Sequence, residues 1–241
     1  MEIYKFTLGW DQLDRVPEDE RLLALMLGKL LNDINILGKL LSWVQIDDNE
    51  IDVERHGRAA QAFLLLTIFA GKLIEGWDLL GVQYFGKQLS RKYHSLIGAK
   101  GQETIDALKA YFSQENPLRT VRRQHSFHYD PALVKEDYAN VPREEPSDFF
   151  LSVPPPLSLF QVSEAVASGA VLRKLGGGNG SEGMNTLVLD SLRISGLFQM
   201  FIGAFMTAFL RLNWPDTPKE TKIDPGKRPS MDSMSLPFLV E

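Results

Sequence analysis

The stretch PEDERLLALMLGKLLNDINILGKLLSWVQ, residues 17–45, decides the fold of this chain. Pro17 fixes φ in a first helical turn, and the acidic residues 18–20 favour the positive end of a helix dipole. Apolar side chains then recur in alternating steps of four and three residues, as they do on one face of an α-helix. These apolar positions are Leu23, Leu27, Leu30, Ile34, Leu37, Leu41 and Val44. The sequence therefore predicts one long amphipathic helix.

A second run with the same stepping follows the polar connection formed by residues 47–50. Its apolar positions are Ala59, Phe63, Leu66, Ala70, Leu73, Trp77 and Leu80. A short connection makes consecutive helices antiparallel neighbours, so residues 17–45 and 55–82 are predicted to pack as a helix hairpin. Leu64, Leu65 and Ile68 lie off the main stripe, which indicates that the second helix is covered on more than one side. We expect an all-α helical bundle with this helix at its centre.

The rest of the chain is predicted to complete a single helical domain of residues 1–241. Further helices are expected near residues 84–97, 102–113, 118–127 and 158–175, and from about residue 186 to 212 after the glycine-rich connection GGGNGSEG. Prolines at 131, 142, 146 and 154–156 predict a Pro-rich connecting loop over residues 131–157, because proline removes a backbone donor. Five later prolines predict an extended tail over residues 213–241.

Composition narrows the class of protein. The chain has no cysteine, which excludes disulfides and thiolate metal sites and favours a reducing, cytoplasmic location. Its first residues form neither a basic leader nor an Arg-rich presequence. A net charge of -5 argues against non-specific coating of nucleic acid, although a local basic patch can still bind it.

One apolar segment raises the question of a membrane. Residues 194–210 are 17 residues long and reach the lower edge of membrane-spanning length. The remaining segments form a soluble bundle that needs a further core helix, so we expect this segment inside the protein. A membrane-attached protein is the alternative.

The segment LRTVRRQHSFHYD, residues 118–130, holds three arginines and two of the four histidines. Arginine is permanently cationic and can grip a phosphate through two parallel hydrogen bonds, whereas histidine exchanges a proton near neutral pH. Together they suit cleavage of an RNA phosphodiester. One group moves the proton of the 2′-hydroxyl or of the leaving oxygen, and the other stabilises charge on phosphorus. This chemistry needs no metal and no other cofactor.

The same segment resembles the HEPN superfamily, helical bundles of bacterial toxins and defence proteins. Their signature is an arginine, four to six residues and then a histidine. Four residues separate Arg123 from His128, and five separate Arg122 from His128 or Arg119 from His125, so the frame stays open. This chain has glutamine after Arg123, where the family often has asparagine. It has aspartate two residues after His128, where one toxin subgroup has tyrosine.

The resemblance covers residues 17–130 and implies a metal-independent endoribonuclease in a toxin or phage-defence setting. It implies that Arg123 and His128 are catalytic. The residues expected to bind the RNA are Arg119, Arg122 and His125. Family members typically assemble the site across a homodimer, so the resemblance also implies a homodimer here, with a cognate antitoxin or defence partner.

Helix geometry sets a condition on this site. Residues five apart on an ideal helix point about 140° away from each other. Arg123 and His128 therefore cooperate only if the helix ends near His128 or if the partner chain supplies the second group. The alternative function is a non-catalytic helical interaction or nucleotide-binding module. In that case the three arginines form a solvated or acid-paired face, and His128 caps a helix end.

Other polar residues are expected to have structural roles. Three residues that begin the second helix are expected in a solvated first turn: Arg55, His56 and Arg58. Glu75 and Asp78 are expected to form a salt bridge or to orient an arginine or histidine of the site. Residues 178–183 match GxGxxG but follow a helix rather than a strand, so no dinucleotide site is expected there. His94 is expected at the surface.

Overall fold

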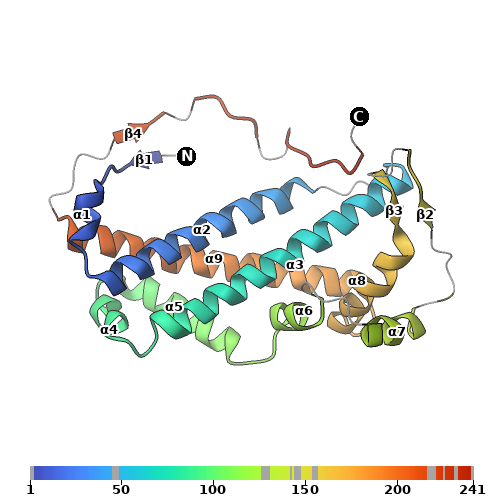
Figure 1. Ribbon diagram of the computed structural model, residues 1–241, viewed down its shortest axis with the longest axis horizontal. Helices are drawn as coiled ribbons and strands as arrows, with labels where there is room; N and C mark the ends of the chain where they lie inside the picture. The colour runs from blue at the N-terminus through green and yellow to red at the C-terminus, as the bar shows by residue number, and fades with distance from the viewer. Residues whose placement is uncertain are drawn as a thin grey trace.

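The computed structural model describes residues 3–44, 49–125, 131–141, 143, 148–153, 157–215, 221–224, 226–230 and 233–239. Three long helices run side by side (Figure 1): α2 (Glu18–Trp43), α3 (Asp52–Gln83) and α9 (Gly180–Asn213). The shorter helices are α1 (Trp10–Asp14), α4 (Gln88–His94), α5 (Gly98–Phe112), α6 (Pro117–His125), α7 (Pro131–Ala139) and α8 (Gln161–Leu175). Two small antiparallel pairs join β1 (Ile3–Lys5) to β4 (Thr221–Ile223), and β2 (Phe149–Phe150) to β3 (Leu159–Phe160). The predicted all-α class is confirmed.

The predicted hairpin is present, and its two helices are antiparallel. Lys72 Nζ lies 3.8 Å from Asp33 Oδ2, and one turn later along α3, Gly76 faces Leu30. Residue numbers along α3 thus increase where those of the facing residues in α2 decrease, as in an antiparallel pair. A Cβ added at Gly76 would lie 2.7 Å from Leu30 Cδ2, so the glycine allows this close approach. The predicted stripes supply the contact, since Leu23, Leu27, Leu30, Ile34, Leu66, Ala70, Leu73 and Leu80 are all buried.

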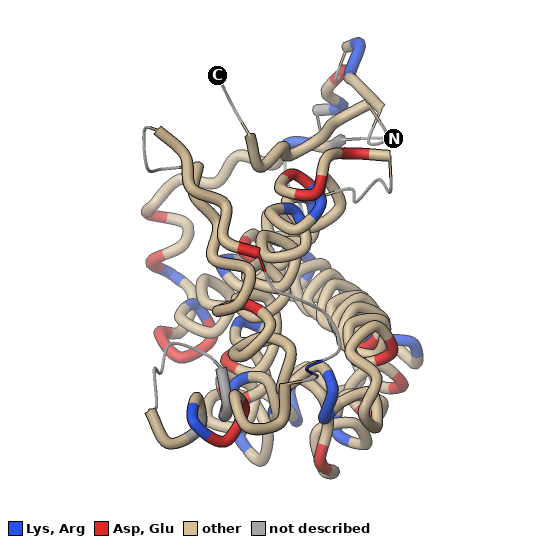
Figure 2. Tube along the Cα trace, turned by 90° about the vertical axis from the view of Figure 1, so that its right-hand side faces the viewer, with Lys and Arg blue, Asp and Glu red and all other residues tan. Residues whose placement is uncertain are grey.

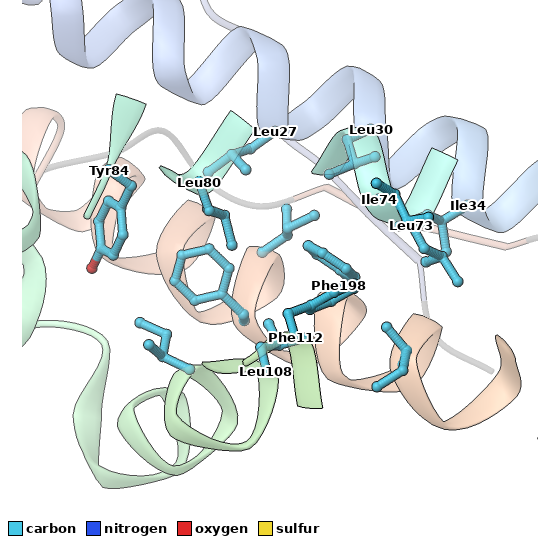
Figure 3. Close-up of a cluster of buried hydrophobic side chains, with 14 of the residues drawn as sticks. Leu27, Leu30, Ile34, Leu73, Ile74, Leu80, Tyr84, Leu108, Phe112 and Phe198 are labelled. Atoms are coloured by element: carbon cyan, nitrogen blue, oxygen red, sulfur yellow. The ribbon is translucent and has the colours of Figure 1, made fainter. Parts of the chain in front are cut away.

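Helix α9 shares the centre of the bundle with α3, because it contacts α2, α3, α5, α6 and α8. Its fully buried side chains include Ile194, Phe198, Phe201 and Phe205. Figure 3 shows Phe198 in a cluster of buried side chains from α2, α3 and α5, together with Tyr84, which directly follows α3: Leu27, Leu30, Ile34, Leu73, Ile74, Leu80, Tyr84, Leu108 and Phe112. By length and composition alone, α9 is also long and apolar enough to cross a membrane. Burial of its phenylalanine face is what a core helix requires.

The Pro-rich segment 131–157 was predicted as a loop, and this is wrong at its start, where α7 begins at Pro131. Proline is well suited to a first helical position, since its missing N–H would have no intrahelical partner there. The next proline in the sequence, Pro142, comes only after α7 has ended. The predicted tail of residues 213–241 begins one residue too early, because Asn213 still belongs to α9; the described residues after it form no α-helix, as expected.

The apolar helix begins earlier than predicted, at Gly180 rather than near residue 186. The Asn179 side chain caps it by accepting hydrogen bonds from the backbone N–H groups of Ser181 (2.9 Å) and Glu182 (3.3 Å). Gly183 then sits against α8, where an added Cβ would lie 1.8 Å from the carbonyl oxygen of Leu172. Part of the predicted glycine-rich connection is therefore helical, and Gly183 allows close helix packing.

A buried carboxylate joins three helices at one end of the bundle. Glu20 of α2 is 1% exposed and accepts hydrogen bonds from Lys92 and Tyr93 of α4 and from Asn213 Nδ2 of α9 (3.1 Å). Burial alone would raise the pKa of Glu20, but these donors outweigh it and hold the pKa below 4.5. The ionised carboxylate is therefore the stabilising form.

This cluster predicts a pH effect on stability. Because the folded pKa is lowered, the stabilisation is complete above the unfolded pKa of about 4.5 and is lost as the pH falls below that value. Glu20→Gln is expected to lower the free energy of unfolding by about 2 kcal/mol at pH 7. The difference between wild type and variant should shrink below pH 4.5 in urea titrations. A difference that stays constant from pH 7 to pH 3 would contradict this account.

Candidate functional site

The arginine-bearing helix α6 is anchored to the core by its apolar face. Leu118 and Val121 are both fully buried. The helix starts where Asn116 precedes Pro117, and Asn116 Oδ1 accepts the backbone N–H of Arg119 at 3.0 Å. A short helix fixed in this way holds its remaining face at the surface. The predicted helix is therefore confirmed from its first turn, and α6 is described as far as His125.

The three arginines of α6 each have a different partner. Arg122 Nη1 lies 3.1 Å from Asp78 Oδ2 of α3. Arg123 contacts both carboxylate oxygens of Glu115, at 2.6 and 3.3 Å, in the turn before α6. The guanidinium carbon of Arg119 lies 6.0 Å from the centroid of the Phe112 ring, within the range of a cation–π contact. Arg122 and Arg123 are thus acid-paired, as the alternative interpretation considered, whereas Arg119 contacts an aromatic ring.

The acidic partners were only partly foreseen. Asp78 pairs with Arg122, in line with the interpretation that it orients an arginine of the site. Glu75 instead forms a salt bridge with Lys72 of its own helix at 3.0 Å. Glu115 was missed. Its sequence signal is weak, because it stands eight residues before Arg123 and outside the helix that carries it.

The structure describes the two histidines of residues 118–130 only in part. His128 lies outside the described residues, and only the backbone of His125 is described. The predicted pairing of Arg123 with His128 therefore stays a prediction. His94 is exposed on α4, as expected.

The prediction of a solvated first turn in α3 is wrong for Arg58. This side chain is buried and contacts Glu50 at 2.9 Å and Glu54 at 2.7 Å. His56 is half-buried, bonds Gln161 at 3.0 Å and stacks on Phe150. The reason is tertiary, because segments distant in sequence cover this end of α3. Arg55 is the exception, with a surface salt bridge to Asp52 at 2.6 Å.

Basic and acidic residues are mixed along the rest of the chain rather than clustered by sign. Figure 2 shows basic and acidic segments interleaved along the trace. Among the described residues no group of three or more His, Asp or Glu side chains could hold a metal ion. The GxGxxG match at residues 178–183 joins α8 to α9, without the strand that a dinucleotide-binding turn requires. Helix α6 is therefore the candidate site.

Comparison of the chain with protein-family models, with curated proteins and with solved structures gave no match.

Proposed function

We propose that this chain binds RNA through α6 and the residues after it, and cleaves it without a metal ion. The observation that carries the proposal is a rigidly anchored helix that presents its arginines to solvent. The side chains of Arg122 and Arg123 are 40% and 61% exposed, so their pairs with carboxylates are surface salt bridges. Such pairs are worth about 0–1 kcal/mol. A phosphodiester group can accept two charge-assisted hydrogen bonds from one arginine. It can therefore displace the carboxylate from such a salt bridge at small cost.

Each residue has a role in this proposal. Arg123, or Arg122 in the alternative frame, holds the phosphate, and His128 moves the proton. Arg119 and His125 contact the RNA beside them. A second copy of the chain supplies the complementary residues of each site. A cytoplasmic toxin or defence effector, with a cognate antitoxin or defence partner, is the setting that the HEPN resemblance implies.

Removal of one arginine tests the binding step. Arg122→Ala and Arg123→Ala are each expected to weaken binding of a single-stranded RNA about fivefold at 0.1 M salt. Each should also reduce the slope of log K against log salt by about 0.7, because one phosphate contact is lost. Fluorescence anisotropy with a labelled 20-nucleotide RNA measures both quantities.

Arg15→Ala is the matched control. Arg15 is also an exposed arginine in a surface salt bridge, to Asp11 at 3.5 Å, but it lies beside α1. This variant should bind RNA as the wild type does. Equal losses for Arg15 and Arg123 would mean that α6 is not the binding surface.

A non-catalytic interaction module is the second candidate. It is favoured by the divergence of the arginines, since Arg122 and Arg123 turn to carboxylates on different elements. Guanidinium groups that diverge do not grip one phosphate. If neither arginine variant changes RNA binding, this second candidate replaces the first.

A further inference from the structure

The C-terminal residues 233–239 lie against the end of the hairpin, where α2 stops and α3 begins (Figure 1). Four hydrogen bonds hold the backbone of this segment. The N–H of Leu236 donates to the carbonyl of Trp43 at 2.8 Å, and Gln61 Nε2 donates to the carbonyl of Pro237 at 3.4 Å. The remaining two run from the N–H groups of Phe238 and Leu239 to the two carboxylate oxygens of Glu54, both at 2.8 Å. We call the receiving surface, formed by Trp43, Glu54, Gly57 and Gln61, the tail groove.

The bound segment has the alternation of an extended strand. Met234, Leu236 and Phe238 are half-buried, whereas Ser233, Ser235 and Pro237 between them are exposed. One side of the segment therefore faces the groove along its length. The ring of Phe238 lies on Gly57, where an added Cβ would come within 2.1 Å of Phe238 Cγ. The missing side chain at position 57 makes the notch that receives the ring.

The acceptor in the groove is held in place by the hairpin itself. Glu54 is 8% exposed, and Arg58 Nε donates to it at 2.7 Å while Arg58 Nη2 contacts Glu50. Burial alone would raise the pKa of Glu54. The backbone N–H groups of Phe238 and Leu239, together with Arg58, outweigh that effect and lower the pKa. The groove thus presents an ionised acceptor to two successive backbone N–H groups.

The tail is not part of the core that it covers. Among the described residues, the last buried member of the core cluster is Phe209, and Trp214 is the last side chain packed against it. Beyond that point β4 pairs with β1, and residues 233–239 occupy the groove. The contacts of the segment are those of a bound peptide, in which backbone hydrogen bonds supply affinity and side-chain notches supply specificity.

The groove has hydrogen-bonding capacity that the tail does not use. Trp43 Nε1, Glu50 Oε2 and Gln61 Oε1 are buried without a hydrogen-bond partner in the described structure. In addition, among the described residues the carboxylates of Glu50 and Glu54 both contact the guanidinium group of Arg58. A peptide with a basic side chain would bring a further cation to these two carboxylates.

We propose that the tail groove is a binding site for an extended peptide of another protein. The peptide carries apolar side chains at alternate positions, a proline followed by an aromatic residue, and a basic side chain nearby. The chain's own tail occupies the groove until such a peptide displaces it. This proposal does not depend on the proposed ribonuclease, because no residue of α6 takes part.

A peptide-binding experiment with the full chain tests the proposal. Leu236→Ser combined with Phe238→Ser releases the tail, and the probe is a labelled peptide of residues 230–241. A tethered tail competes at an effective concentration of about 1 mM, so the tail-released chain should bind at least about tenfold more tightly than the wild type. Fluorescence anisotropy reports the affinity of each chain for the peptide.

Two glycines of α3 provide a matched pair of groove variants. In the tail-released chain, Gly57→Ala fills the notch and should weaken peptide binding at least about tenfold without lowering the unfolding temperature, since alanine favours a helix. Gly71→Ala should bind as its parent does, because no described residue outside its own helix backbone lies within 4 Å of its added Cβ.

Three results would overturn the proposal. One is no binding by the tail-released chain, and another is equal binding by the Gly57 and Gly71 variants. The third is a wild-type dimer that dissociates when the tail is released, which would assign the groove to the tail of a second copy.

Discussion

His128→Ala is expected to reduce RNA cleavage by at least about 100-fold, because proton transfer by a positioned histidine contributes that much to the rate. The HEPN resemblance gives His128 this role, and α6 holds Arg122 and Arg123 a few residues before it. The fold should survive, since the described core is built without this residue. Single-turnover cleavage of a labelled RNA in the presence of EDTA measures the loss, and circular dichroism checks the fold.

A second variant shows whether the site is shared between two copies. Arg123→Ala should also be inactive. If Arg123 and His128 act from different subunits, mixing the two inactive variants should restore about a quarter of wild-type activity, because about half of the dimers then carry one intact site. His94→Ala is the matched control and should leave cleavage unchanged, since this histidine is exposed on α4. Cleavage that persists without His125 and His128, or that needs a divalent metal, would rule the mechanism out.

Gly183→Ala is expected to lower the free energy of unfolding by about 3 kcal/mol, the upper end of the usual cost of overpacking. The added Cβ would lie 1.8 Å from the carbonyl oxygen of Leu172, and this oxygen also accepts the N–H of Gly176 that ends α8. A backbone carbonyl cannot change rotamer as a long side chain can. The clash is therefore relieved only if α8 and α9 separate. Thermal unfolding should show a decrease of about 6–12 °C.

Gly203→Ala on the same helix is the control. In the part of the chain that the structure describes, nothing beyond the backbone of α9 lies within 4 Å of a Cβ added there, so the substitution should raise the unfolding temperature slightly through the helix preference of alanine. If both variants change stability alike, close packing at Gly183 is not the reason for its glycine.

The candidate site shows how far sequence reasoning reaches. A helix was expected from the sequence near residues 118–127, and α6 starts there with Asn116 as its cap, because the signals that begin a helix involve residues within one or two turns. The partners of the arginines depended on how helices pack. Asp78 reaches Arg122 only because α3 lies beside α6.

Arg58 illustrates the same limit more clearly. Its pairing with Glu54, four residues earlier, is a local helix contact that the sequence contains. The surroundings of its partner are not local, because Glu54 accepts the backbone N–H groups of Phe238 and Leu239, 184 and 185 residues further along the chain. The start of α3, which was predicted to be solvated, therefore forms part of the tail groove.

By itself, the sequence determined the all-α class, the hairpin of α2 and α3 and a core helix over residues 194–210, since each depends on the arrangement of apolar side chains along one helix. The tertiary structure alone decided which charges are paired, which glycines are contact points and where the tail binds. These features depend on distances between segments far apart in the chain. Helical periodicity says which face of a helix is buried, but not what lies against it.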